Sequence, residues 1–145
     1  MIVKLNPITE AELDQLMKIW LTSNQEAHSF IAEAYWEGNV AAVKLQLPES
    51  ELYGFKNSAG QIVGFVGIVD HYLAGIFVEK NYRGQGIGEQ LIMQAKSQHH
   101  ELSLSVYKKN RAAIKFYRAQ GFTIVSEQVD VETLEVEYKM SWVRE

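Results

Sequence analysis

The chain has 145 residues, of which 47% are hydrophobic and 22% charged, and we expect one globular domain spanning residues 1–145. Because the sequence contains no cysteine, disulfides, thiolate metal sites and cysteine nucleophiles are excluded, and no metal site is predicted. No signal peptide is recognisable, and no apolar run approaches the roughly 18 residues of a membrane span. We therefore expect a cytoplasmic protein without a membrane partner.

The charge of the chain is unevenly distributed along the sequence. The net charge of -4 argues against nucleic acid as a partner. The window from Lys80 to Arg118 carries +6, however, while the rest of the chain carries -10. Such a basic window favours a polyanionic ligand. The alternative is that its basic side chains only solvate two helix surfaces.

Apolar periodicity and turn residues predict a strand, two helices, three strands, a helix, a strand, a helix and two strands. We expect the first six elements over residues 2–6, 10–22, 26–46, 51–56, 61–69 and 73–78. The third helix ends at about residue 98, and the last four elements cover residues 102–106, 110–120, 122–126 and 134–142. A capping box, Thr9-x-x-Glu12, begins the first helix. The pair Gly38–Asn39 predicts a break within the second helical region, and Asn57–Gly60 predicts a hairpin turn.

A glycine-rich bend at Arg83–Gly88 follows the apolar run Gly75–Val78 and precedes a helical pattern. Strand, glycine loop and helix N-terminus together expose backbone N–H groups at the positive end of a helix dipole, which predicts an anion site. Glu89 occupies the position of the third glycine of a dinucleotide fingerprint, and no Gly-Lys-Ser/Thr triplet of a P-loop follows. The alternative is an ordinary glycine-rich turn between a strand and a helix.

A second motif lies between Asn110 and Phe122 and reads N-x-x-A-x-x-F-Y-x-x-x-G-F. Asn110 suits a helix N-cap, and Gly121 suits the residue that ends the helix. This motif and the pattern Arg83-x-x-Gly86-x-Gly88 resemble the GCN5-related N-acetyltransferase (GNAT) superfamily. The resemblance spans Ile62–Trp142, and the order of the predicted elements extends it to the whole chain.

The resemblance implies an α/β (α+β) GNAT fold. In this fold a mixed, mostly antiparallel sheet of six to seven strands is splayed between strands 4 and 5, with about four helices on its two faces. It also implies transfer of an acetyl group from acetyl-CoA to a primary amine of an unidentified small molecule or peptide by direct attack. A non-catalytic module that binds or senses acyl-CoA is the alternative. The protein is expected to be a monomer or homodimer, because exposed sheet edges can pair.

The resemblance also assigns site residues. The strand backbone would pair with the pantetheine arm, the glycine bend would bind the pyrophosphate, and the second motif would line the cofactor. The residues expected to bind the cofactor are Ile76, Phe77, Val78, Arg83, Gly84, Gln85, Gly86, Ile87, Gly88, Glu89, Asn110, Ala113, Phe116 and Tyr117. Tyr117 stands at the position of the family's general acid, since a phenol can protonate a departing thiolate. The alternative is that its ring packs and its hydroxyl bonds a helix end.

The general base is not apparent in the sequence. Several members of the family carry glutamate or histidine at the position aligned with Tyr72, and we expect Tyr72, Ala74, Ile76 and Val78 to share one strand face. Water or a residue of the N-terminal helices would then accept the proton. His28, Phe30 and Tyr72 are the candidate residues of the acceptor site, although a histidine between helices can be purely structural. The remaining aromatic residues near His28 could line the acceptor pocket or pack in the core, namely Trp20, Tyr35 and Trp36.

Overall fold

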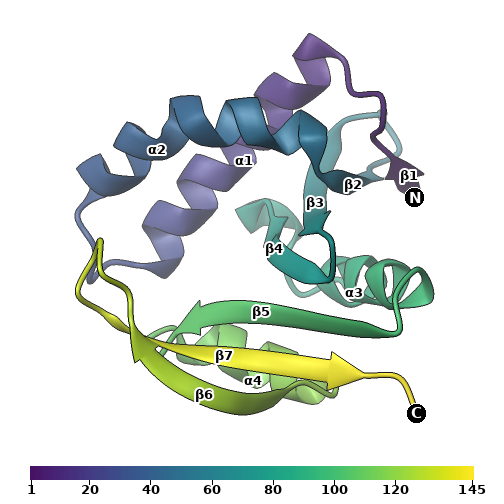
Figure 1. Cartoon of the computed structure of the whole chain (residues 1–145). Helices are drawn as coiled ribbons and strands as arrows, with labels where there is room; N and C mark the ends of the chain where they lie inside the picture. The colour runs from purple at the N-terminus through teal and green to yellow at the C-terminus, as the bar shows by residue number, and fades with distance from the viewer.

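The computed structural model describes residues 1–145 and contains a seven-stranded sheet in the order β1-β2-β3-β4-β5-β7-β6 (Figure 1). The predicted order of elements is confirmed. The elements are β1 (Ile2–Lys4), α1 (Glu10–Ala27), α2 (Glu33–Gln46), β2 (Glu51–Lys56), β3 (Ile62–Val69), β4 (Tyr72–Val78), α3 (Ile87–Ser97), β5 (Glu101–Tyr107), α4 (Arg111–Ala119), β6 (Thr123–Val129) and β7 (Val136–Val143), with short 3-10 turns at Leu47–Glu49 and Lys80–Tyr82. None of the four helices combines the length and apolar composition needed to cross a bilayer.

Helices cover both faces of the sheet and create two apolar cores. On one face, α1 and α2 pack on the sheet around Leu16, Trp36 and Phe65. On the other face, α3 and α4 enclose a second cluster that includes Leu91 and Tyr117. The predicted fold class, a splayed mixed sheet with helices on its two faces, is therefore confirmed.

The sheet is splayed between its two central strands. β4 and β5 are parallel and pair at a single position, Tyr72 with Ser103, whereas every other neighbouring pair of strands is antiparallel and extends over several residues. The Ser103 N–H donates to the His71 carbonyl at 2.9 Å, and beyond this point the strands separate (Figure 1). The last strand, β7, inserts between β5 and β6 and so completes the C-terminal half of the sheet.

A β-bulge in β4 contradicts the predicted strand face. The partner of Gly67 is Gly75 and that of Ile68 is Leu73, so the residue between them, Ala74, has no partner in β3. The extra residue shifts the alternation of side chains. Leu73, rather than Ala74, consequently packs in the same cluster as Ile76 and Val78.

The boundaries of the first two helices also differ from the prediction. α1 continues to Ala27, five residues further than expected, and the chain leaves helical geometry at residues 28–32. The predicted break at Gly38–Asn39 is wrong, because α2 runs through it without interruption. The Asn39 side chain donates to the Tyr35 carbonyl one turn back at 2.7 Å, so this polar residue is accommodated inside the helix.

The predicted capping box at the start of α1 is confirmed. The Thr9 hydroxyl accepts from the Glu12 N–H at 3.1 Å, and the Glu12 carboxylate accepts from the Thr9 N–H at 3.0 Å. We expect Thr9→Ala to lower the free energy of unfolding by about 1 kcal/mol, as urea denaturation would measure, because the Glu12 N–H loses its acceptor. Thr22→Ala in the middle of the same helix is the control, and an equal loss there would contradict the capping role.

Candidate active site

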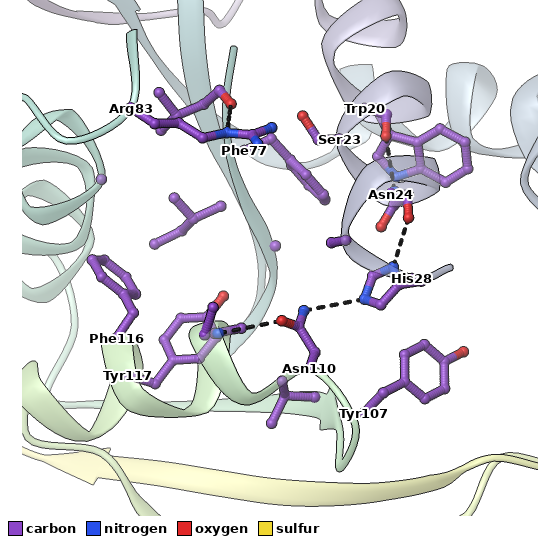
Figure 2. A pocket seen from close by; sticks show the side chains of 18 of the residues that line it. Trp20, Ser23, Asn24, His28, Phe77, Arg83, Tyr107, Asn110, Phe116 and Tyr117 are labelled. Carbon is purple, nitrogen blue, oxygen red and sulfur yellow. Dashed lines mark hydrogen bonds between the residues drawn. The ribbon is translucent and has the colours of Figure 1, made fainter. Parts of the chain in front are cut away.

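A cavity of about 710 Å³ lies in the gap between β4 and β5 (Figure 2). Most of the site residues predicted from the sequence line it: His28, Tyr72, Ile76, Phe77, Val78, Arg83, Gly84, Gly86, Ile87, Gly88, Glu89, Asn110, Ala113, Phe116 and Tyr117. Gln85 does not line the cavity. Phe30 does not line the cavity either, but its ring centre lies 5.7 Å from that of His28 and 5.9 Å from that of Tyr107.

The loop between β4 and α3 carries a row of free backbone donors. Gly84 and Gly86 adopt φ angles of 78° and 81°, which favour glycine, and Gly86 is the N-cap of α3 with no side chain capping the helix. The N–H groups from Gly84 to Glu89 have no hydrogen-bond partner within the protein. Six such donors at the positive end of a helix dipole fit the pyrophosphate of a bound polyanion.

Arg83 fastens this loop to the sheet. Its Nε donates to the Val78 carbonyl at 2.9 Å, and its guanidinium lies 3.6 Å from the Glu26 carboxylate at the end of α1. The side chain therefore joins the loop, β4 and α1, in addition to contributing positive charge at the rim of the cavity.

The backbone of β4 is open on the side that faces β5. Beyond Tyr72 the strand has no partner on this side, so its amide groups can hydrogen-bond an extended amide-containing chain lying in the gap. The side chains are engaged elsewhere, since Ile76 and Val78 pack against the α3–α4 core and the Phe77 ring lies 5.1 Å from that of Phe65. The available contacts at these positions are therefore those of the main chain.

Tyr117 projects from α4 toward the cavity and is only 9% exposed. Its ring contacts those of Phe116 and Phe122 edge to face. Burial raises the pKa of Tyr117 well above its usual range; the neighbouring Tyr72 raises it further, and the backbone of Ile76 opposes the shift. The phenol is consequently protonated at neutral pH and can act as a proton donor.

His28 and Asn110 join the two halves of the molecule across the cavity (Figure 2). Asn110 caps α4, as predicted, with its Oδ1 accepting from the Ala113 N–H at 3.3 Å. Its Nδ2 therefore faces the His28 Nε2, at 3.2 Å, while the His28 Nδ1 lies 3.0 Å from the Asn24 carbonyl. This geometry assigns the neutral tautomer that is protonated at Nδ1 and accepts at Nε2.

A wall of aromatic and small polar residues from α1 and α2 closes the cavity opposite α4. The Trp36 ring stacks on His28 at 5.0 Å and meets Trp20 edge to face at 5.9 Å. Ser23 and Asn24 belong to the same wall and were not predicted as site residues, nor was Tyr107. Ser23, Asn24 and Ala27 follow Trp20 at spacings of three, four and seven, and this helical pattern was the signal available in the sequence.

The loop between β6 and β7 reaches across to the N-terminal helices (Figure 1). The Tyr35 hydroxyl donates to the Glu132 carboxylate at 2.7 Å, and the Tyr107 hydroxyl donates to the Asp130 carboxylate at 2.6 Å. Burial raises the pKa values of both phenols, and the neighbouring carboxylates raise them further. Both hydroxyls therefore keep the protons that make these bonds, and the open end of the splay is fixed.

The His28 tautomer gives a testable prediction. Burial lowers the pKa of His28, while its bond to Asn24 opposes this shift. In the unfolded chain a histidine has a pKa of about 6.5, so His28 binds a second ring proton more readily when the protein is unfolded. The free energy of unfolding should therefore fall as the pH drops below about 6.5. Imidazole ¹⁵N spectra across this range should show the Nδ1-protonated form.

Asn110→Asp is the sharpest variant for this test, because aspartate retains the cap of α4 but replaces the donor facing His28 with a charged acceptor. The His28 pKa should then exceed that of the wild-type protein. An unchanged or lower pKa in this variant would show that Asn110 does not set the protonation state of His28.

Comparison with known proteins shows which family the chain belongs to. A family model described as an acetyltransferase (GNAT) domain matches residues 48–124. The peptidyl-lysine N-acetyltransferase YiaC of Escherichia coli K12 is 35% identical over 134 residues, which cover 91% of each chain. The peptidyl-lysine N-acetyltransferase YjaB of the same organism is 29% identical over 124 residues, covering 86% of this chain and 84% of the relative.

Solved structures show the same fold. The solution structure of apo-form YjaB from Escherichia coli superimposes with a TM-score of 0.84 and 26% identity, covering 100% of this chain and 98% of the other. The PaiA N-acetyltransferase of Thermoplasma acidophilum, crystallised with coenzyme A, gives a TM-score of 0.79 and 20% identity, covering 99% and 98% of the two chains. The chain belongs to the GNAT family and is an N-acetyltransferase.

Proposed function

We propose that the protein transfers the acetyl group of acetyl-CoA to the side-chain amine of lysine in a peptide or protein, with Tyr117 as the general acid. The observation that carries this proposal is the single cavity in which free loop N–H groups, an unpaired strand edge and a buried phenol meet. The lysine acceptor is supported by the two relatives, whose names give peptidyl-lysine as their substrate.

The residues of the cavity suit the parts of acetyl-CoA, the donor that GNAT acetyltransferases use, and one fold neighbour was crystallised with coenzyme A. The N–H groups of Gly84–Glu89 would hold the pyrophosphate. The open backbone of Ile76–Val78 would pair with the amides of the pantetheine arm. Ala113 and Phe116 of α4 would pack against the same arm from the other side.

The bound donor supplies a thioester, whose carbonyl carbon forms the new C–N bond as its C–S bond breaks. Tyr117 then gives its proton to the departing sulfur, which leaves as a thiol. Its buried position keeps this proton in place until sulfur begins to carry negative charge. The phenolate that remains takes up a proton from water, and the attacking nitrogen releases one proton, so the reaction balances as amine plus thioester giving amide plus thiol.

The lysine must attack as the neutral amine, and its nitrogen must lose one further proton on the way to the amide. Among the cavity-lining residues, His28 and Glu137 are the candidate bases on the acceptor side. The Nε2 lone pair of His28 already accepts from Asn110, so His28 positions the wall rather than taking the proton. Glu137 or water is left as the proton acceptor, and Glu137 carries no signal in sequence that would have marked it.

Tyr117→Phe tests the role of the phenol. We expect kcat to fall by about 100- to 10,000-fold, because the thiolate must leave without a positioned acid. Binding of acetyl-CoA by calorimetry should be unchanged, since the ring remains. Release of free coenzyme A thiol can be followed with a thiol reagent, because the protein has no cysteine of its own. Unchanged turnover in Tyr117→Phe would remove the phenol from the mechanism.

Gly86→Ala tests the pyrophosphate loop against a matched control, Gly60→Ala. Both glycines have a φ near 80° and open space where a Cβ would stand, but Gly60 lies in the β2–β3 turn and does not line the cavity. Both variants should lose roughly 1 kcal/mol of stability through backbone strain. Only Gly86→Ala should weaken acetyl-CoA binding, by about tenfold or more, which corresponds to about 1.4 kcal/mol. Equal affinities would exclude the loop as the binding site.

A further inference from the structure

Two polar atoms in the wall of the cavity lack a partner. The Ser23 Oγ of α1 and the Trp36 Nε1 of α2 are the buried side-chain nitrogen and oxygen atoms that make no hydrogen bond in this structure. The two residues are 7% and 8% exposed, and both line the cavity. Buried polar groups in folded proteins are almost always hydrogen-bonded. Two buried polar atoms without a partner in the wall of one cavity therefore indicate where a ligand atom binds.

The surroundings hold the Trp36 ring in a fixed position. The Trp36 ring is stacked on His28 and contacts the edges of Trp20 and Tyr35, so its N–H cannot turn to a new partner without disturbing three rings. Ser23 follows Trp20 by one turn of α1. Ser23 in α1 and Trp36 in α2 come from the helices opposite α3 and α4, which carry the pyrophosphate loop and Tyr117 (Figure 1). The pair therefore faces the acceptor rather than the acetyl donor.

The chemistry of the pair restricts the ligand group. The indole N–H can only donate, and the serine hydroxyl can donate as well, so the ligand must offer an oxygen that accepts hydrogen bonds. The charged side chains that line the cavity are Arg83, Glu89 and Glu137, and none of them belongs to α1 or α2. Arg83, the one cation, is bonded to Val78 and Glu26. A carboxylate beside Ser23 would be a buried charge without a counter-ion, which is unfavourable. A neutral carbonyl carries no charge and needs no counter-ion.

We propose that the Ser23 Oγ and the Trp36 Nε1 form a subsite that binds a neutral amide carbonyl of the acceptor, the main-chain carbonyl of a lysine-containing peptide. This inference rests on the proposed function, because it identifies the group that distinguishes peptidyl lysine from a simple alkylamine. The subsite makes these two residues determinants of acceptor specificity, with no part in binding acetyl-CoA or in proton transfer.

The direct test is the indole N–H resonance of Trp36 in ¹H–¹⁵N spectra, assigned by its loss in Trp36→Phe. With coenzyme A bound, so that no turnover occurs, the blocked peptide acetyl-Gly-Lys-Gly-amide should move this resonance downfield. Butylamine, which has the amine but no carbonyl, should leave it in place. The indole signal of Trp142, whose ring packs in the α3–α4 core outside the cavity, serves as an internal reference.

Steady-state kinetics provide the second test. In Ser23→Ala and in Trp36→Phe, the KM for the peptide should rise by roughly three- to tenfold, the effect of losing one neutral hydrogen bond. The kcat/KM for butylamine and the affinity for acetyl-CoA should be unchanged. Ser58→Ala in the β2–β3 turn and Trp142→Phe are the matched controls for the two substitutions.

Each result separates the subsite from the proposed function. Peptide turnover without a shift of the Trp36 signal, or equal losses with peptide and butylamine in both variants, would overturn the subsite and leave a packing role. A shift of the Trp36 signal by peptide, with no turnover of either amine, would support the subsite and refute the proposed function. Neither shift nor turnover would overturn both.

Discussion

The single parallel contact between β4 and β5 is the constraint on which the rest of the structure depends. Because the two strands pair only at Tyr72 and Ser103, the sheet opens beyond that point and leaves one edge of β4 without hydrogen bonds. A sheet paired along its whole length would have no cavity at its centre and no main-chain groups to offer a ligand. The splay thus converts unused backbone bonding capacity into a binding surface.

The wide end of the splay is held by side chains rather than by the backbone. His28 meets Asn110 and Tyr35 meets Glu132, so the N-terminal helices are tied to the C-terminal half, while the bond from Tyr107 to Asp130 holds the β6–β7 loop against β5. These bonds bridge the opening that the strands leave. The cavity consequently has a fixed width at both ends, as catalysis by positioning requires.

The cavity works mainly with neutral groups. Its proposed anion site is made of backbone N–H groups, its proposed acid is a buried phenol, and its central imidazole is held neutral by burial. Few charged side chains line the space between them. In such surroundings hydrogen bonds are stronger than in water, and each unpartnered polar atom carries more weight in selecting the ligand.

Features whose signals are local could be predicted from the sequence, whereas features that depend on distant contacts became visible only in the folded chain. The capping box at Thr9, the glycine bend at Arg83–Gly88 and the Asn110 cap were readable because each signal lies within a few residues. The bulge at Ala74 was not readable, since it is defined by pairing with β3. The bond from His28 to Asn110 joins positions 82 residues apart. The isolation of Ser23 and Trp36 likewise exists only once two helices pack, because a polar atom lacks a partner only in relation to everything folded around it.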